Sequence, residues 1–239
     1  MKKIFVLAGL LFIMLSVAIF QELKTDDILL YYYKASSFDK LQKITTMVSS
    51  GTIVKQDRMP IKIIRMRQDK FLQIFDVADI TCYSGYDGTT AWMRVPYTGN
   101  PKPQLMPGDA ATDIMIKADF DGLLFHWKAK GEQLELSGRD TIGDNLAYKL
   151  KLTRKDGGTE YYSIAVKSGL LLKREYTRLI RGKEVKMEVF YRDYREVEGI
   201  PLAFTIESQM GGQPNNTIVF DSIVLNEQLE AKLFEMPSK

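Results

Sequence analysis

The sequence contains one histidine and one cysteine, and this scarcity removes several kinds of site. His126 alone cannot supply the two or more histidines of many zinc sites, and beside Trp127 we expect it to pack structurally. Cys82 has no partner for an internal disulfide, and its place in a predicted strand favours a small buried residue over a nucleophile. A glycine-rich phosphate loop is also lacking. We therefore expect no metal, no cofactor and no enzyme, although carboxylate chemistry stays open.

An excess of charge of one sign is also missing, since the net charge is only +3 and would fall to about +1 without Lys2 and Lys3. Nucleic-acid-binding proteins normally show a clear basic excess. We therefore expect no nucleic-acid partner.

The N-terminus has the three parts of an export signal. Lys2 and Lys3 precede an apolar run from Ile4 to Phe20, and the small residues Ser16 and Ala18 favour cleavage after Ala18. A membrane anchor is the alternative, but the run of about 17 residues is at the short limit for a span. No cysteine follows it to accept a lipid anchor. The sequence predicts a signal peptide, 1–18, and a mature periplasmic domain, 19–239.

Hydrophobic periodicity predicts two short helical segments and then strands. Thr25 is placed to cap the first helix, and a second helical segment covers 38–44. From about Val48, short turn signals separate stretches rich in β-branched and aromatic residues. Five such stretches, the last divided at Gly211-Gly212, predict an antiparallel meander because short links cannot join parallel neighbours: 146–154, 159–167, 170–180, 184–196 and 201–225. The predicted fold class is mainly β with a few helices.

One helix interrupts the strands. A loop rich in proline and glycine ends at Pro107, and 109–119 then reads as a helix with Ala111, Ile114, Met115 and Ala118 on one stripe. Such a helix could act as a lid over a cavity or simply plug one end of the sheet. The segment Asp119-Phe120-Asp121-Gly122 is a poor calcium loop because its glycine comes too early, so we interpret it as a helix end and turn.

Bulky apolar residues gather around this helix, among them Phe71, Phe75 and Trp92. A curved, incompletely closed sheet with such residues on its concave side must be filled, either by its own helices or by an acyl ligand. Physical reasoning alone favours the filled core. Phe71 and Phe75 are separated by an even number of residues and should share a face.

At these residues the sequence resembles the LolA-like periplasmic lipoprotein carriers, also called outer-membrane lipoprotein-sorting proteins. The similarity lies in the segments 67–71, 86–92 followed by Pro96, and 233–237, in the family's order and at similar spacing. Gln68 stands where the family usually has proline, and Val95 where it often has asparagine. The resemblance covers nearly the whole mature chain.

The resemblance implies an unclosed half-barrel covered by lid helices, whose apolar cavity carries the acyl chains of a lipoprotein or another lipid across the periplasm. The concentration of aromatic residues gives the hypothesis that Phe71, Phe75 and Trp92 bind lipid in a cavity beneath the helix that contains Ile114 and Met115. The resemblance implies that Arg67 is a latch, which holds the lid closed by hydrogen bonds to the lid backbone. Arg67 could equally be a solvated residue beside Arg65, with which it shares a strand face. The implied protein is a monomer that meets a releasing complex at the inner membrane and an acceptor at the outer membrane. A periplasmic sensory or protein-binding module with the same half-barrel is the alternative.

Overall fold

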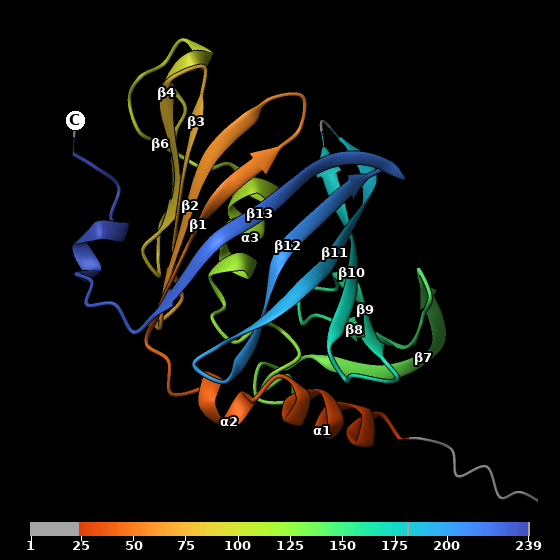
Figure 1. Ribbon diagram of the computed structural model, residues 1–239. Coiled ribbons are helices and arrows are strands. Elements are labelled where there is room, and N and C mark those ends of the chain that lie inside the picture. The colour runs from red at the N-terminus through yellow and green to blue at the C-terminus, as the bar shows by residue number, and fades with distance from the viewer. Residues whose placement is uncertain (1–23, 181, 239) are drawn as a thin grey trace, which may run out of the picture.

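The computed structural model describes residues 24–180 and 182–238, and it contains one large antiparallel sheet. The predicted signal peptide therefore lies outside the described residues. Thirteen strands pair in the order β6-β5-β4-β3-β2-β1-β13-β12-β11-β10-β9-β8-β7, and β6 and β7 remain unpaired edges. The sheet curls into a half-barrel that does not close (Figure 1). The predicted fold class, a mainly β unclosed half-barrel with helices, is confirmed.

The strands follow the chain as a meander, apart from the pairing of β1 with β13 that joins the two halves of the sheet. The turn signals of the sequence separate them as predicted, and the five stretches expected between 146 and 225 are β8 to β13. The strand bounds are β1 Thr46–Val54, β2 Arg58–Met66, β3 Lys70–Val77, β4 Ile80–Tyr86, β5 Ala91–Arg94, β6 Gln104–Leu105, β7 Gln133–Ile142, β8 Asn145–Thr153, β9 Thr159–Ala165, β10 Leu171–Ile180, β11 Lys183–Val197, β12 Ile200–Met210 and β13 Gln213–Leu225.

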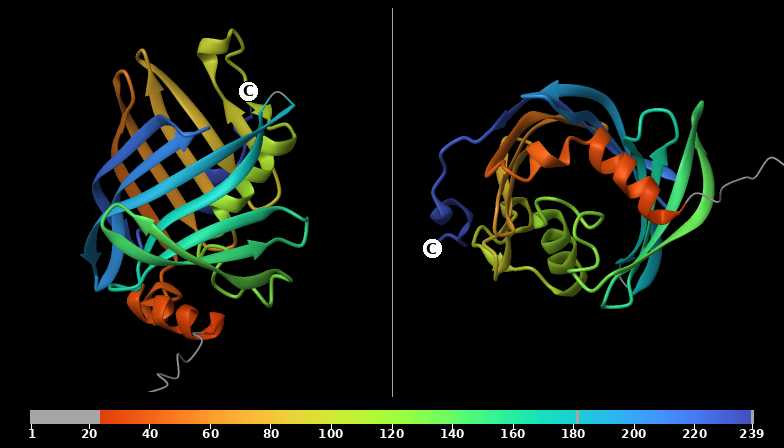
Figure 2. Two further views of the ribbon diagram at one scale, coloured as in Figure 1. Left: turned by 90° about the vertical axis from the view of Figure 1, so that its right-hand side faces the viewer. Right: turned by 90° about the horizontal axis from the view of Figure 1, so that it is seen from below.

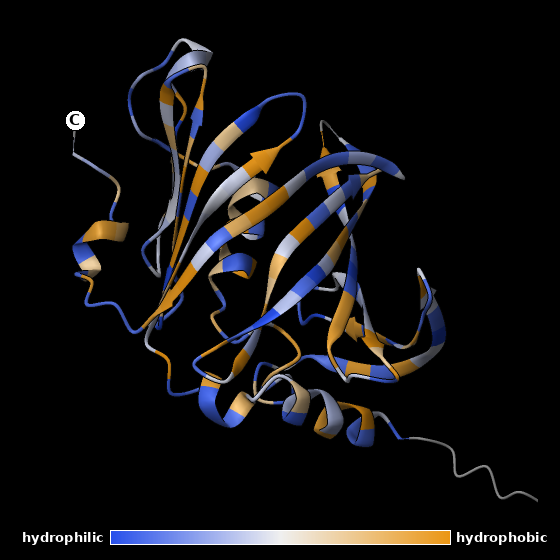
Figure 3. Ribbon diagram, viewed as in Figure 1, coloured by the Kyte–Doolittle hydropathy of each residue, from blue (hydrophilic) through white to orange (hydrophobic). Residues whose placement is uncertain are grey.

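Hydrophobic and hydrophilic residues alternate along many of these strands (Figure 3). Because successive side chains of a strand point to opposite faces, the alternation gives the sheet a concave and a convex face. The register connects the concave positions across the sheet, from Phe71 on β3 through Arg65 on β2 and Met47 on β1 to Leu225 on β13.

Helices α1 (Thr25–Ala35) and α2 (Phe38–Leu41) lie across one end of the half-barrel (Figure 2). Their aromatic side chains close this end by stacking on Phe125, which is 2% exposed. The ring centroids of Phe38 and Tyr33 lie 4.0 and 4.7 Å from that of Phe125, and such pairs add roughly 0.5–1.5 kcal/mol each beyond the area they bury.

The predicted helix cap at Thr25 is wrong, because Lys24 occupies the N-cap position. The backbone N–H of Lys24 instead donates to Asp27 Oδ2. Thr25 Oγ1 accepts a hydrogen bond from the backbone N–H of Leu136, on the edge strand β7. The Thr25 hydroxyl, which the local sequence pattern placed in the helix cap, therefore binds the sheet instead.

Helix α3 (Gly108–Ala118) lies on the concave side of the sheet, and the chain turns away directly after it (Figure 2). This element matches the helix predicted at 109–119. Asp119-Phe120-Asp121-Gly122 forms the predicted helix end and turn, with Gly122 at φ +86°. Two single-turn helices, η1 (Pro96–Thr98) and η2 (Ala231–Phe234), complete the elements, and η2 packs on the convex face.

None of the helices in the described residues is long and apolar enough to cross a membrane. Cys82 is fully buried, as predicted for a small core residue. His126 differs from expectation because it is exposed, with its ring edge-on to Phe38 at 5.3 Å.

Candidate functional site: a cavity on the concave face

A cavity of about 580 Å³ lies between the concave face of the sheet, the loop after α3 and the closed end of the half-barrel. Ligand-binding cavities are commonly of about 300–1,000 Å³. Strands from both halves of the sheet contribute apolar side chains, among them Met47, Ile53, Ile63, Ile206, Ile218 and Phe220. The helices and the loop therefore fill only part of the concave space, and the completely filled core favoured by physical reasoning alone is not what the structure shows.

Arg174 and Tyr162 line one part of this wall, and both bind the carboxylate of Glu160, which does not itself line the cavity. Glu160 on β9 is completely buried and forms ion pairs with Arg174 at 2.6 Å and Arg154 at 2.9 Å, while Tyr162 donates to it at 2.7 Å. Burial raises the pKa of Glu160, but the two guanidinium groups and the phenol outweigh it and keep the pKa below its usual value. The carboxylate is thus ionised and its acceptors are satisfied, as a buried charge requires.

Helix α3 presents different residues to the sheet and to the cavity. Ile114 is 5% exposed and packs with Phe71 and Tyr86, while Asp113 and Lys117 form an ion pair of 3.0 Å at the cavity. Burial raises the pKa of Asp113, whereas Lys117 and the other nearby cations lower it. The cations have the larger combined effect, so the pKa lies below its usual value. The helix therefore combines an apolar contact with the sheet and a charged contact with the cavity.

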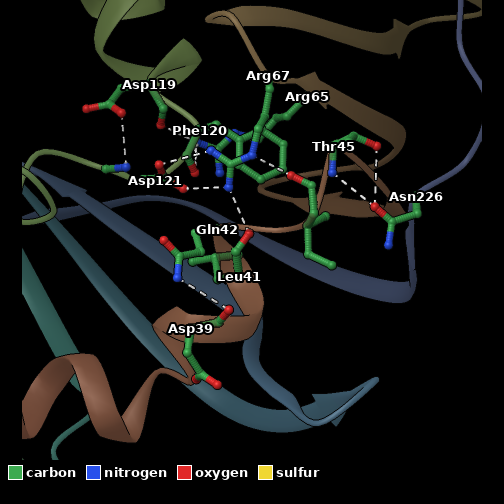
Figure 4. Close-up of polar contacts among 12 residues, drawn as sticks. Asp39, Leu41, Gln42, Thr45, Arg65, Arg67, Asp119, Phe120, Asp121 and Asn226 are labelled. Carbon is green, nitrogen blue, oxygen red and sulfur yellow. Dashed lines mark hydrogen bonds and ion pairs between the residues drawn. The ribbon is translucent and has the colours of Figure 1, made fainter.

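Two arginines, Arg65 in β2 and Arg67 directly after it, hold the turn that follows α3, as Figure 4 shows. Arg67 binds Asp121 through Nη1 at 3.0 Å and Nη2 at 2.9 Å, and it donates to the carbonyls of Ile44 and Leu41 at 2.6 and 2.8 Å. Its guanidinium also lies 4.6 Å from the centre of the Phe120 ring. Arg67 is therefore not a plain solvated residue.

Arg65 makes the contact that the sequence interpretation assigned to Arg67. Its Nη2 donates to the backbone carbonyls of Asp119 and Phe120, the latter at 3.1 Å. Arg65 thus binds the backbone of the loop, and Arg67 binds a carboxylate of the same loop. Strand alternation placed both on one face, but only tertiary packing shows which acceptors each can reach.

The structure brings together some of the residues assigned to lipid binding and separates others. Phe71 and Ile114 pack together, and of the two only Phe71 also lines the cavity. Phe75 shares the concave face with Phe71, as strand alternation predicts, but it pairs with Cys82 and lies beyond the residues that line the cavity. Met115 is 47% exposed and does not continue the apolar stripe of α3.

Trp92 lies on the opposite face of the sheet. Its indole packs with Leu72 and Phe234, is 1% exposed, and donates to the carbonyl of Phe234 at 2.8 Å. A second hollow, of about 560 Å³, adjoins it on the convex side. The predicted place of Trp92 beneath α3 is wrong, because Trp92 lies on the other face of the sheet. In the register, Trp92 pairs with Gly85 and Phe71 pairs with Tyr86, so the side chains of Trp92 and Phe71 point to opposite faces.

Sequence reasoning missed the cavity residues that come from α1, from the loop after α3 and from the second half of the sheet. Tyr32, Phe125 and Tyr191 are the main examples, and they meet across separations of more than 60 residues. The aromatic content of these segments was visible, but no local pattern indicates that they face one space.

Comparison of the fold with known proteins relies on structure, since no family model matches the sequence and no curated protein matches it. A LolA superfamily protein from Nitrosomonas europaea superposes with a TM-score of 0.59 at 14% identity, covering 90% of this chain and 98% of that one. A putative outer membrane lipoprotein-sorting protein domain from Vibrio parahaemolyticus gives 0.57 at 10% identity, covering 86% and 95%. The fold is LolA-like.

A DUF1329 family protein from Desulfovibrio piger is similar as well, with a TM-score of 0.60 at 14% identity over 87% of this chain and 97% of that one. The resemblance stated from the sequence is thus confirmed for the LolA-like fold. At these identities the comparison concerns the backbone, so what the cavity binds has to be argued from its own residues.

Proposed function

We propose that this LolA-like protein is a periplasmic carrier that binds the acyl chains of lipoproteins or other lipids in its concave cavity. The observation that carries the proposal is a cavity of about 580 Å³ walled largely by apolar side chains and bordered by α3 and its loop. A structural neighbour, the putative outer membrane lipoprotein-sorting protein domain from Vibrio parahaemolyticus, supports it. Binding by apolar contacts without catalysis is consistent with such a wall.

An acyl chain needs such a site because exposing it to water costs about 0.8 kcal/mol per methylene group. Apolar contacts are not directional, so a chain can slide out when the lid opens and a stronger acceptor is present. We propose that α3 and the turn at 119–122 are this lid, with Arg65 and Arg67 holding it to β2. A releasing complex and an outer-membrane acceptor would be its partners at the two membranes.

The test is the binding of a fluorescent fatty-acid probe and its displacement by a purified acylated lipoprotein. Ile206→Asp introduces a charge into the cavity wall, whereas Thr205→Asp places the same charge on the other face of β12, opposite Arg192. We expect the first variant to lose probe binding by at least tenfold, because burying a carboxylate among apolar groups costs several kcal/mol. The second should bind like the wild type.

Equal binding by the two folded variants would show that the probe does not occupy this cavity. Native mass spectrometry of the protein purified from its own periplasm would identify what the protein carries. Bound lipid or acylated protein supports the carrier, and a bound unacylated protein segment would instead support a protein-binding module.

A further inference from the structure

Arg65 is a cation in the apolar wall of the cavity. It projects from the concave face of β2, and its direct neighbours across the sheet are Met47 on β1 and Phe71 on β3. Arg65 donates two hydrogen bonds in the described structure, both from Nη2 to backbone carbonyls. Its Nε is buried and has no acceptor. A guanidinium has five donors, so much of its capacity is unused.

The nearby carboxylates are engaged by other cations. Asp121 binds Arg67 through both oxygens, and Asp119 Oδ2 binds Lys130. Asp69, the next acid along, is exposed and forms no ion pair among the described residues. Arg65 consequently has no carboxylate within 4 Å in the part of the chain that the structure describes.

Burial lowers the pKa of Arg65, with the charge of Asp119 opposing the shift. The side chain is partly buried and its Nε has no acceptor, so an anion placed beside the guanidinium would form ion-pair hydrogen bonds that the cavity wall does not supply. Tyr191 on β11 lines the same cavity, and burial raises the pKa of its phenol, which stays protonated and able to donate. The wall therefore offers a cation and a hydroxyl to an oxygen anion.

We propose that Arg65 binds the anionic head group of an acyl ligand, a carboxylate or a phosphate, while the chain lies along the apolar wall. The inference rests on the proposed function, and it narrows the ligand class from any acyl chain to acyl chains with an oxygen anion at one end. A guanidinium suits either group because its planar fork can donate to two oxygens at once.

The experiment compares four ligands with the same twelve-carbon chain by calorimetric titration: dodecanoate, dodecyl phosphate, dodecan-1-ol and dodecyltrimethylammonium. A charge-assisted hydrogen bond corresponds to about a tenfold or greater gain in affinity. We expect the wild type to bind one or both anions at least about tenfold more tightly than the cation. The better of the two anions distinguishes a fatty-acid carboxylate from a lipid phosphate.

Two variants remove the free cation in different ways. Arg65→Gln deletes the charge, and Met47→Glu supplies an internal carboxylate from the neighbouring strand while leaving the hydrogen bonds of Arg65 to the loop available. In each variant that folds, the affinities for the anions and for the cation should lie within about twofold of each other. Arg58→Gln, an exposed guanidinium at the start of β2, is the control and should keep the wild-type preference.

Retention of the full anion preference in either folded variant overturns the inference, and so does a wild type without a preference. If all four ligands bind the wild type equally, the acyl cavity stands and only the role of Arg65 fails. If none binds, dodecanol included, the proposed function itself fails.

Discussion

Arg67 illustrates how a single side chain can join three segments of the chain. Its guanidinium binds Asp121 in the loop after α3 and the carbonyls of Leu41 and Ile44 at the closed end of the half-barrel. Lysine could not reproduce this geometry because it lacks the planar fork. The side chains of the pair are 28% and 15% exposed, so the ion pair is largely shielded from water.

We predict that Arg67→Leu destabilises the protein by about 3 kcal/mol, because it leaves Asp121 without its counter-ion in a partly buried site. The loop should open first, and hydrogen exchange over 107–122 should become faster with and without lipid. Arg192→Leu breaks an ion pair whose side chains are 47% and 36% exposed and should change stability by less than about 1 kcal/mol. Unchanged exchange and unchanged lipoprotein release in Arg67→Leu would show that Arg67 is not a latch.

Gly85 makes room for the indole that sequence interpretation had assigned to the cavity. A Cβ at this position would lie 2.4 Å from Cε2 of Trp92, whose side chain is 1% exposed and is also held by its hydrogen bond to Phe234. We predict that Gly85→Ala lowers the free energy of unfolding by about 1–3 kcal/mol, as overpacking of a core does. Denaturant titration measures it, with Ser84→Ala on the other face of β4 as the control. Because Trp92 lies on the convex face, probe binding at 25 °C should persist in the folded fraction.

At the scale of elements, charges on the convex face connect β8, β10 and β11. Glu175 on β10 is 4% exposed and is approached by Lys149 at 2.6 Å, Lys173 at 3.2 Å and Lys186 at 2.6 Å. Lys149 contacts Oε2 as an ion pair, but the angles of this contact are not those of a hydrogen bond. Burial raises the pKa of Glu175, but the three ammonium groups outweigh it and lower the pKa from 4.5 to about 2.

This lowered pKa predicts that the free energy of unfolding falls at acidic pH. Since the folded pKa lies below the unfolded one, the contribution of Glu175 is complete above pH 4.5 and is lost as the pH falls towards 2. It amounts to roughly 3 kcal/mol at most. Glu175→Gln should therefore be less stable than the wild type in urea at pH 7, and the difference should shrink by pH 2.5. Glu135→Gln, in an exposed pair with Lys151, should show almost no difference, and an equal effect of the two would contradict the assignment.

At the scale of the whole molecule, the half-barrel leaves one side open between β6 and β7. Helix α3 and its turn lie on the concave side, and α1 and α2 close one end. In the carrier that we propose, this open side is where an acyl chain would enter sideways, which a closed barrel would prevent.

The proposed carrier has to be exported, and the first residues predict how. We expect the mature chain to begin near Ile19 and to be released from cells by osmotic shock. N-terminal sequencing of the released protein measures the cleavage site. Recovery of a membrane-bound form that keeps residues 1–18 would contradict the prediction and favour an anchored protein.

Much of this fold could be predicted because its signals are local. Strand alternation and turn residues between 146 and 225 predicted β8 to β13, and helical spacing predicted α3 to within a residue at each end. Alternation also placed Arg65 beside Arg67 and Phe71 beside Phe75. Each of these inferences uses residues only a few positions apart, where backbone geometry limits the possibilities.

The sequence by itself determined the antiparallel class and the helix inserted among the strands. Tertiary structure alone decided that β1 pairs with β13, that Trp92 faces away from α3, and that Asp121 binds Arg67 while Nε of Arg65 has no acceptor. The physical reason is that these facts depend on which strand face becomes concave. Alternation tells which residues share a face, but the direction in which the sheet curls is set by packing between segments distant in the chain.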